Sequence, residues 1–439
     1  MSVLVVRGGR ALRGSAVVPG DKSISHRALM LAALADGPTR IERLSGCRDV
    51  SRTRACLERL GVPIRRADTE AVEVRGLGPR GLSGPPLTLD CGDSGTTMRL
   101  LAGLLAGQER TFTLRGGPGL CRRPMERVVG PLRTMGADVR TAAGRPPVSG
   151  RGGQLAGVTV DLELASAQVG SALLLAGLNA RGVTVVRYPA PVRDHTERML
   201  AHMGVDVQWS ALETRLAGPV RRLAAPHGGV MAVPGDVSAA AFLLAAAAAV
   251  PGSEVEVAGL GLNPGRTGAL EVLARMGARV EVRLSATVAG EPVGRVTVGA
   301  DQLRSVDVAG SLVPRLVDEL PLVAVLGSRA VGRTSVRGAS ELRVKESDRV
   351  AAMVEGLRRM GATITSRPDG FDVDGPCELR GARVSGWQDH RVVMALAVAG
   401  LAAEGETVVE DAERVADSFP GFVEALVSLG GQVTVRDEV

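Results

Sequence analysis

Val18-Pro-Gly-Asp-Lys-Ser-Ile-Ser-His-Arg27 is the stretch where a strand-like segment gives way to a helix. Pro19 and Gly20 interrupt the preceding run, because neither residue continues a regular strand well. Ser23 and Ser25 carry side chains that commonly cap a helix N-terminus. The stretch therefore predicts a strand, a tight turn and a capped helix, in that order.

Residues 28–35 follow as the apolar run Ala-Leu-Met-Leu-Ala-Ala-Leu-Ala, which predicts a buried helix that stops at Gly37. Lys22 and Arg27 would then lie at the helix N-terminus, where backbone N–H groups attract an anion. Two cations, two hydroxyls and these N–H groups suit a phosphate. The simpler alternative, a capped core helix with two solvated bases, stays open at this point.

Val233-Pro-Gly-Asp236 repeats the start of this stretch, and a second Ala/Leu-rich helix is predicted over residues 237–246. The chain therefore looks duplicated, with one copy of the loop opening each half. If both copies are crossings, residues 1–20 plus 235–439 form one domain and residues 21–234 form the other. Hinges at the two loop glycines would let the domains close over a ligand.

The composition fits a two-domain globular chain that handles small anions. At 439 residues, two domains are the natural expectation, and a hydrophobic content of 45% is ample for two cores. The net charge of +6 is not gathered into Lys/Arg tracts with interleaved aromatic residues. This pattern argues against a nucleic-acid groove and favours small anionic substrates.

The cysteines and the apolar runs indicate the cellular compartment in which the protein is expected. Five scattered cysteines without a CxxC pair indicate neither a disulfide framework nor a zinc site, so a reducing cytoplasm is expected. No signal-peptide pattern precedes the first domain, and the longest apolar run, residues 239–250, is too short to cross a bilayer. We therefore expect no membrane partner.

A second repeat recurs about every 70 residues, the length of one supersecondary unit. Each copy pairs Leu or Met with Gly and precedes a strand-like run. Residues 350–360 show the preceding amphipathic helix, with Gly361 as its stop. The six copies are Leu60-Gly-Val, Met135-Gly-Ala, Met203-Gly-Val, Met276-Gly-Ala, Met360-Gly-Ala and Leu429-Gly-Gly.

Each unit also carries a more apolar helix with a polar start. These helices are expected to begin near Ser23, Ser94, Ser166, Asp236, Ser311 and Gln388. One surface helix, one buried helix and hairpin-like strands per unit predict an α/β fold with three units in each of two domains. If the buried helices lie parallel, their positive N-terminal ends face a shared cleft.

Two Gly-containing loops are candidate anion sites. Ser94-Gly-Thr-Thr-Met-Arg99 opens a buried helix, and Gly95 would let a ligand approach the backbone, although glycine also serves ordinary turns. The loop over residues 116–125 contains Arg123, which suits a carboxylate or phosphate. Cys121 in this loop is a nucleophile or acid in one interpretation and, preferably, a neutral buried thiol in the other.

Ser166-Ala-Gln-Val169 and Arg193-Asp-His-Thr-Glu197 each open a helix with polar side chains. Helix capping explains both equally well. His195 is interpreted as a local hydrogen-bonding group and not as a base.

The most highly charged run is Glu341-Leu-Arg-Val-Lys-Glu-Ser-Asp-Arg349, just before an amphipathic helix. The helix dipole explains acids in this position but disfavours bases there, so the bases suggest a bound anion. Glu346 beside Lys345 can exchange protons. Asp318 is expected within an apolar helix, where a carboxylate needs a function or a local hydrogen bond.

These residues together resemble the 5-enolpyruvylshikimate-3-phosphate synthase family over nearly the full chain. The resemblance implies a two-domain enolpyruvyl transferase fold of six repeated α/β units, three per domain, in an inverse α/β barrel around an inter-domain cleft. The motifs that carry it are Asp21-Lys-Ser-Ile-Ser-His-Arg27, Gly92-Asp-Ser-Gly-Thr96, Arg123-Pro-Met125, Ser166-Ala-Gln168, Arg193-Asp-His-Thr-Glu197, Arg343-Val-Lys-Glu-Ser-Asp-Arg349 and Asp389-His-Arg391.

The resemblance implies transfer of enolpyruvate from phosphoenolpyruvate to the 5-hydroxyl of shikimate 3-phosphate, in chorismate and aromatic amino acid biosynthesis. The implied catalytic residues are Asp318, Glu346, Lys22 and Lys345. Asp318 would take the proton of the attacking hydroxyl, and Glu346 with the two lysines would move protons at the methylene carbon and the bridging oxygen. The implied shikimate 3-phosphate ligands are Lys22, Ser23, Arg27, Ser166, Ala167, Gln168, Arg193, Asp318 and Lys345. The implied phosphoenolpyruvate ligands are Lys22, Gly95, Arg123, Gln168, Arg349 and Arg391.

Addition followed by elimination needs one acid and one base that reverse roles, so no metal or organic cofactor is expected. The expected partners are the two small substrates, and the chain is expected to act as a monomer. Glyphosate is expected to compete with phosphoenolpyruvate beside Gly95. Relatives often have Asn where Asp93 stands, and some have Lys where Asp417 stands, which removes one cation near phosphoenolpyruvate.

Two competing interpretations remain from the sequence. The sister family that transfers enolpyruvate to a UDP-amino sugar shares the repeated fold and a loop cysteine, but it has Asn where Ser23 stands. A non-catalytic repeat protein that binds phosphorylated metabolites would not need Asp318 and Glu346.

Overall fold

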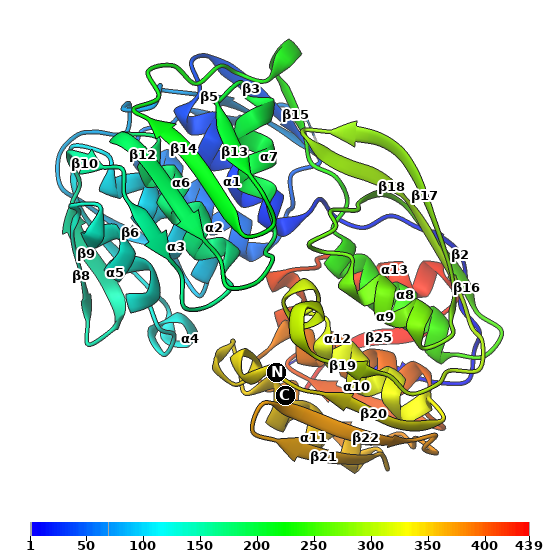
Figure 1. Cartoon of the computed structure of the whole chain (residues 1–439). Helices are drawn as coiled ribbons and strands as arrows, with labels where there is room; N and C mark the ends of the chain where they lie inside the picture. The colour runs from blue at the N-terminus through cyan, green and yellow to red at the C-terminus, as the bar shows by residue number, and fades with distance from the viewer. Residues whose placement is uncertain (1, 69, 439) are drawn as a thin grey trace. The chain divides into compact units, whose positions relative to one another are not determined.

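The computed structural model describes residues 2–68 and 70–438, without the side chain of His227. Its contacts separate two compact units, coloured along the chain in Figure 1. Unit 1 comprises Met1–Pro19, Gly235–Ala286 and Pro292–Val439, and unit 2 comprises Gly20–Pro234 and Thr287–Glu291. The sequence boundaries place all of residues 235–439 in one domain, whereas Thr287–Glu291 groups with unit 2.

Three sheets form the strand framework of unit 2 in the described residues. The first has the order β15 (Val230–Ala232), β3 (Pro38–Glu42), β5 (Ala71–Arg75), β4 (Ile64–Arg66). The second has the order β6 (Leu87–Asp90), β7 (Thr111–Arg115), β9 (Arg145–Arg151), β8 (Asp138–Ala142). The third has the order β10 (Leu155–Ala156), β12 (Ala180–Arg187), β14 (Glu213–Gly218), β13 (Val207–Trp209), with β11 (Thr159–Asp161) also on β12.

Unit 1 also has three sheets among its described residues. The first has the order β17 (Arg279–Val288), β18 (Glu291–Gly299), β16 (Glu254–Gly261), β2 (Arg13–Ala16). The second has the order β19 (Asp307–Val308), β20 (Gly332–Val336), β22 (Gly370–Gly375), β21 (Thr363–Arg367). The third has the order β23 (Arg383–Val384), β24 (Glu406–Glu410), β1 (Ser2–Arg7), β25 (Gln432–Asp437).

All six sheets share one pairing pattern. One strand pairs in parallel with a second, the second pairs antiparallel with a third, and the third pairs antiparallel with a fourth, as β6, β7, β9 and β8 do. A parallel pair needs a crossover connection, and a buried helix supplies it in the four sheets whose parallel strands lie close together in the chain. In three sheets one strand comes from a distant part of the chain, namely β15, β2 and β1. The six repeated α/β units predicted from the sequence correspond to these six sheets.

Six buried helices make the two hydrophobic cores. In unit 2 they are α1 (Lys22–Leu34), α3 (Gly95–Ala106) and α6 (Ala167–Gly177), and in unit 1 they are α8 (Val237–Ala249), α10 (Leu320–Arg329) and α12 (His390–Leu401). Every residue of α8 is buried. Small side chains let the helices approach closely, since a Cβ on Gly103 of α3 would lie 2.0 Å from the carbonyl oxygen of Ala172 in α6.

Six outer helices end at the predicted Leu/Met-Gly signatures. They are α2 (Arg48–Arg59), α5 (Glu126–Thr134), α7 (His195–His202), α9 (Gly268–Arg275), α11 (Arg349–Arg359) and α13 (Phe422–Ser428). The Leu or Met is buried, and the glycine takes a left-handed φ of between +78° and +96°. Only glycine adopts this conformation without strain, so the prediction of the helix ends is confirmed.

The helix starts differ from the prediction in two places. Asp21, not Ser23 or Ser25, caps α1, because its carboxylate accepts a hydrogen bond from the Ile24 backbone N–H. Ser311 lies in the 3₁₀ helix η2 (Gly310–Arg315), and the apolar helix α10 begins only at Leu320.

The remaining short helices connect the repeats. They are α4 (Pro118–Cys121), η1 (His227–Gly229), η3 (Ser340–Val344) and η4 (Ala412–Asp417). No helix in the described part of the chain has the length and apolar character needed to cross a membrane.

Candidate active site

Lys22 is the first residue of α1 in unit 2 and lies beside a carboxylate. Its Nζ is 3.0 Å from Oδ2 of Asp49, and both side chains are mostly buried. Asp21 occupies the capping position, so Lys22 lies at the N-terminus of α1, the positive end of the helix dipole. The predicted juxtaposition of a base with a helix N-terminus is therefore present.

Arg27 lies one turn further along α1 and is 4% exposed. Its guanidinium donates hydrogen bonds to Thr196 Oγ1 at 2.8 Å, the Ser23 carbonyl oxygen at 2.8 Å and Ser171 Oγ at 2.7 Å. Burial lowers the pKa of Arg27 to about 10, against the smaller opposing effects of Glu197 and Asp21. A buried cation that donates to three neutral oxygens is a favourable site for an anion.

The N-termini of α3 and α6 meet at Gln168. Its Oε1 accepts a hydrogen bond from Arg99 Nη1 at 2.7 Å, and its Nε2 donates to Thr96 Oγ1 at 2.9 Å. Gly95 lies under two guanidinium groups, since an added Cβ would be 2.7 Å from Arg99 Nη1 and 2.9 Å from Arg123 Nη1. The structure thus places Gly95, Arg123 and Gln168 in one basic corner of unit 2.

Asp93 fixes the glycine-rich loop next to this corner. Its Oδ1 accepts a hydrogen bond from the Leu120 backbone N–H at 2.9 Å. A Cβ on Gly117 would lie 2.7 Å from the same oxygen, so the loop needs glycine to pack against the carboxylate. Cys121 is exposed and its thiol donates to the Gly116 carbonyl oxygen, so the preferred prediction of a buried thiol was wrong.

A buried chain of hydroxyl groups links α1 to the start of α3. Nδ1 of His26 is 2.7 Å from Thr53 Oγ1, which is 2.7 Å from Thr97 Oγ1, and Thr97 donates to Ser94 Oγ at 2.8 Å. Burial, and then the positive charges of Lys22 and Arg27, hold the pKa of His26 well below its ordinary value. His26 is therefore neutral and holds the two helix starts together.

The other predicted ligands of unit 2 lie at helix starts. Ser166 caps α6 through the Val169 backbone N–H, and Ala167 is the first residue of that helix. Arg193 precedes α7 and is close enough to Arg27 to lower its pKa by charge repulsion.

Arg349 is the centre of the charged cluster in unit 1 and is 2% exposed. Its guanidinium donates to both carboxylate oxygens of Asp389 at 2.8 and 3.2 Å, to Glu346 Oε2 at 2.7 Å and to Asp318 Oδ1 at 3.4 Å. Burial alone would lower the pKa of Arg349, but Asp389, Glu346 and Asp318 together raise it above its ordinary value. Arg349 thus connects the two predicted catalytic carboxylates.

Asp318 precedes α10 and does not lie within a helix, contrary to the prediction. Its carboxylate is 3.7 Å from Lys345 Nζ and 3.9 Å from Arg266 Nη1. Lys345 is also 3.5 Å from Glu341. The structure therefore brings Asp318 together with Lys345, Glu346 and Arg349, which belong to a different motif.

Arg391 lies in the first turn of α12 and is 5% exposed. Its Nη1 donates to the Ser238 carbonyl oxygen at 3.4 Å and is 3.8 Å from Glu319 Oε1. The guanidinium carbon is 5.5 Å from the ring centre of Phe242. Asp417 Oδ2 is 3.7 Å from Arg414 Nη1.

Several residues of these clusters escaped the sequence analysis. Asp49 pairs with Lys22, Arg99 binds Gln168, and Arg266 donates to Asp236 at 3.1 Å. Asp49 and Arg266 lie tens of residues from their partners, and no local pattern marks them. Arg99 could have been found from its position one turn after the Ser94 cap.

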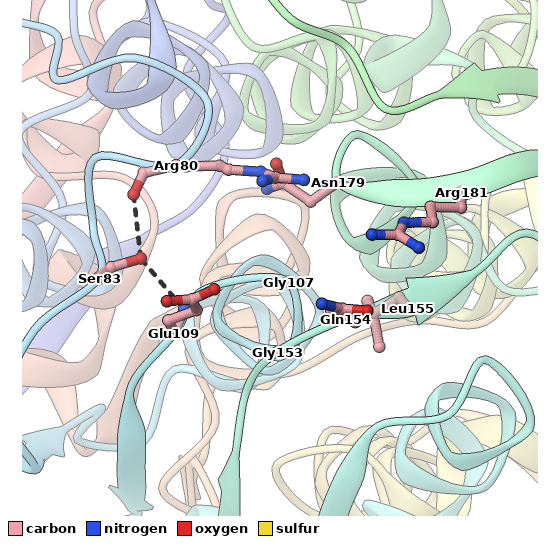
Figure 2. A pocket seen from close by; sticks show the side chains of 9 residues that line it. All are labelled: Arg80, Ser83, Gly107, Glu109, Gly153, Gln154, Leu155, Asn179 and Arg181. Atoms are coloured by element: carbon pink, nitrogen blue, oxygen red, sulfur yellow. Dashed lines mark hydrogen bonds between the residues drawn. The ribbon is translucent and has the colours of Figure 1, made fainter.

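A pocket of about 280 Å³ in unit 2 lies apart from these clusters (Figure 2). It is lined by Arg80, Ser83, Gly107, Glu109, Gly153, Gln154, Leu155, Asn179 and Arg181. Asn179 follows the C-terminal end of α6, opposite the end that carries Gln168. None of the predicted site residues lines it.

The chain is similar to known proteins over nearly its full length. The model of the family described as EPSP synthase (3-phosphoshikimate 1-carboxyvinyltransferase) matches residues 6–426. The 3-phosphoshikimate 1-carboxyvinyltransferase of Anaeromyxobacter sp. (strain K) is 51% identical over 431 residues, which cover 98% of this chain and 96% of that protein. The protein of the same name from Syntrophomonas wolfei is 46% identical over 423 residues, covering 96% of this chain and 98% of the relative.

Solved structures show the same fold over the whole chain. The structure of EPSP synthase from Acinetobacter baumannii has a TM-score of 0.88 and 38% identity, and covers 99% of this chain and 100% of that one. The enolpyruvyl transferase NikO from Streptomyces tendae shares the fold with a TM-score of 0.80 at 21% identity, covering 99% of each chain. On its sequence and its fold, the chain belongs to the EPSP synthase family.

Proposed function

We propose that the protein transfers the enolpyruvyl group of phosphoenolpyruvate to the 5-hydroxyl of shikimate 3-phosphate and releases phosphate. The observation that carries this proposal is the gathering of Asp318, Lys345, Glu346 and Arg349 in unit 1. Two carboxylates held by cations supply the acid and the base that addition and elimination require.

Unit 2 supplies cations for the two substrates, each of which carries a phosphate and a carboxylate. Arg27, Arg99 and Arg123 are each at most 9% exposed, and the hydrogen-bond acceptors of Arg27 are neutral. We assign shikimate 3-phosphate to Arg27 with the other residues that the resemblance implies, namely Lys22, Ser23, Ser166, Ala167, Gln168, Arg193, Asp318 and Lys345. We assign phosphoenolpyruvate to the corner of Gly95, Arg123 and Gln168, with Lys22, Arg349 and Arg391.

The reaction begins with addition. The 5-hydroxyl oxygen forms a bond to C2 of phosphoenolpyruvate while Asp318 removes the hydroxyl proton, and Glu346 protonates the methylene carbon to a methyl group. In the elimination, Glu346 takes a proton back from that methyl group, and the bond between C2 and the bridging oxygen breaks. Lys345, with Lys22 beside it, gives a proton to that oxygen as phosphate leaves, and the proton held on Asp318 then returns to Lys345, whose Nζ is 3.7 Å from the Asp318 carboxylate. Atoms and charges therefore balance without an oxidant or a cofactor.

The assay measures phosphate release with shikimate 3-phosphate and phosphoenolpyruvate, omitting each substrate in turn. Release that requires both substrates, together with a product of the expected mass, supports the proposal. A parallel reaction with UDP-N-acetylglucosamine as acceptor tests the sister activity. Turnover with the UDP-sugar alone, or full activity of Glu346→Gln, would contradict the assignment.

We further propose that the enzyme works as a monomer in the cytoplasm. The measured molar mass by light scattering at the assay concentration tests the monomer, with 45.3 kDa as the expected value.

A further inference from the structure

The hairpin of β17 and β18 has a tip that groups with unit 2. The two turn residues, Ala289 and Gly290, have φ values of +48° and +81°, which suit a tight two-residue turn. Ala289 is 6% exposed and belongs to the hydrophobic core of unit 2. The tip is therefore docked and is not a free surface loop.

Backbone contacts fix the tip against α7. Arg198 Nη1 donates to the Gly290 carbonyl oxygen at 3.2 Å, and Arg198 Nε donates to Asp194 Oδ1 at 2.8 Å. A Cβ on Gly290 would lie 2.9 Å from the Arg198 carbonyl oxygen, so the two backbones are in close contact. The position requires glycine for both its φ and its space.

A buried acid–histidine pair completes the docking. Nδ1 of His195 lies 2.7 Å from Glu291 Oε1, and the two side chains are 2% and 0% exposed. Because a carboxylate only accepts hydrogen bonds, Nδ1 carries the proton. Burying a carboxylate is costly unless it is paired, so the pair holds His195 firmly at the start of α7.

The first turn of α7 leads directly to the buried guanidinium of Arg27. Thr196 follows His195, accepts a hydrogen bond from Arg27 Nε at 2.8 Å and donates to Ser171 Oγ at 2.7 Å. Ser171 in turn accepts from Arg27 Nη2 at 2.7 Å. Because Thr196 is the next residue after His195, any shift of His195 also moves the Thr196 hydroxyl, which orients Arg27.

We propose that Glu291 and His195 are positioning residues that hold Thr196, and through it Arg27, in the orientation that binds shikimate 3-phosphate. This proposal rests on the proposed function for the identity of the ligand, but the docking itself does not. The carboxylate of Glu291 lies 96 residues along the chain from the histidine that it holds.

The test compares variants that break the pair with variants that keep its hydrogen bond. Glu291→Ala and His195→Leu remove it, whereas Glu291→Gln and His195→Asn retain an acceptor and a donor of similar reach. Glu281→Ala on the same hairpin is the matched control, because Glu281 pairs with Arg283 at the surface. Binding of shikimate 3-phosphate is measured by calorimetry, KM for both substrates by steady-state kinetics, and backbone protection of α7 by hydrogen–deuterium exchange.

We expect Glu291→Ala and His195→Leu to weaken shikimate 3-phosphate binding by about tenfold, with less than about a twofold change in KM for phosphoenolpyruvate. Glu291→Gln, His195→Asn and Glu281→Ala should stay within about twofold of the wild type. The double variant should be no weaker than the worse single variant, because both remove one contact. Exchange in the first turn of α7 should rise in the two breaking variants without any substrate.

Equal losses for both substrates would indicate a general structural role and overturn the proposal. Unchanged shikimate 3-phosphate binding in Glu291→Ala would overturn it as well, whatever the exchange result. If the wild type binds no shikimate 3-phosphate, the proposed function fails. Faster exchange in α7 of the breaking variants would then still support the docking.

Discussion

Replacing Asp389 by asparagine should destabilise unit 1 strongly while changing only one atom. The Asp389 side chain is 0% exposed; Oδ2 accepts from Arg349 Nε at 2.8 Å and from Ser347 Oγ at 3.1 Å. Oδ1 accepts from the Arg391 backbone N–H at 2.9 Å and caps α12. In Asp389→Asn the oxygen can keep the cap, but the amide NH₂ then faces two donors.

The magnitude follows from the burial of Arg349. Removing one partner of a buried ion pair costs about 3–5 kcal/mol. Arg349 keeps its contacts with Glu346 and Asp318, so the lower end, about 3 kcal/mol, is expected. With a urea m-value of about 2–3 kcal/mol per molar, the midpoint of unit 1 should fall by about 1 M.

The assay follows tryptophan fluorescence during urea unfolding. The chain has two tryptophans, and Trp209→Phe leaves Trp387 in unit 1 as the reporter, two residues from Asp389. The matched control is Asp374→Asn in the same background, because Asp374 pairs with Arg333 at the surface and little stability depends on such pairs. Equal midpoint shifts for the two variants would refute the reasoning.

Three further predictions follow from particular contacts. Burial alone would raise the pKa of Asp372, but hydrogen bonds from Arg337 and Arg367 hold it at about 2. The ionised form of Asp372 therefore stabilises the fold, fully above about pH 4 and progressively less as the pH falls toward 2. The urea midpoint of Asp372→Asn should accordingly lie below that of the wild type at pH 7, and the difference should vanish as the pH approaches 2. A difference that grows on acidification would contradict this sign. Gly103→Ala places a Cβ 2.0 Å from a backbone oxygen and should lower the unfolding free energy by about 3 kcal/mol. Gly130→Ala in α5 has open space around its Cβ and should raise the unfolding free energy slightly. Thermal or urea unfolding that shows the same sign for both variants would contradict the close packing inferred at Gly103. Gly95→Ala forces the ends of the Arg99 and Arg123 side chains to move, so it should raise the inhibition constant of glyphosate more than KM for phosphoenolpyruvate. Equal increases in the inhibition constant and in KM would contradict the assignment of phosphoenolpyruvate and glyphosate to the Gly95 corner.

The repeat architecture was predictable because its signal is local. A glycine after a buried Leu or Met needs a left-handed φ, and this requirement ends each outer helix whatever packs around it. The starts of α1 and α10 were less predictable. Asp21, Ser23 and Ser25 all can cap a helix, and only the folded backbone decides which one does.

The site residues were found where a motif combines charge with a helix start. The five-residue span from Lys345 to Arg349, which includes Glu346, lies within one motif, and the structure adds Asp318 to it. The partners that hold these groups, such as Asp49 for Lys22 and Glu291 for His195, come from distant elements. Tertiary contacts set these pairs, so no spacing in the sequence reveals them.

We propose above all that Glu346 and Asp318 move protons while enolpyruvate is transferred by addition and elimination. The most direct measurement runs the complete reaction in D₂O and determines the deuterium content of the enol ether methylene by mass spectrometry. The account predicts deuterium in that methylene group, because a methyl group forms and loses a hydrogen at the same carbon, and it predicts no labelled product with Glu346→Gln. A product formed at the normal rate without deuterium would contradict it.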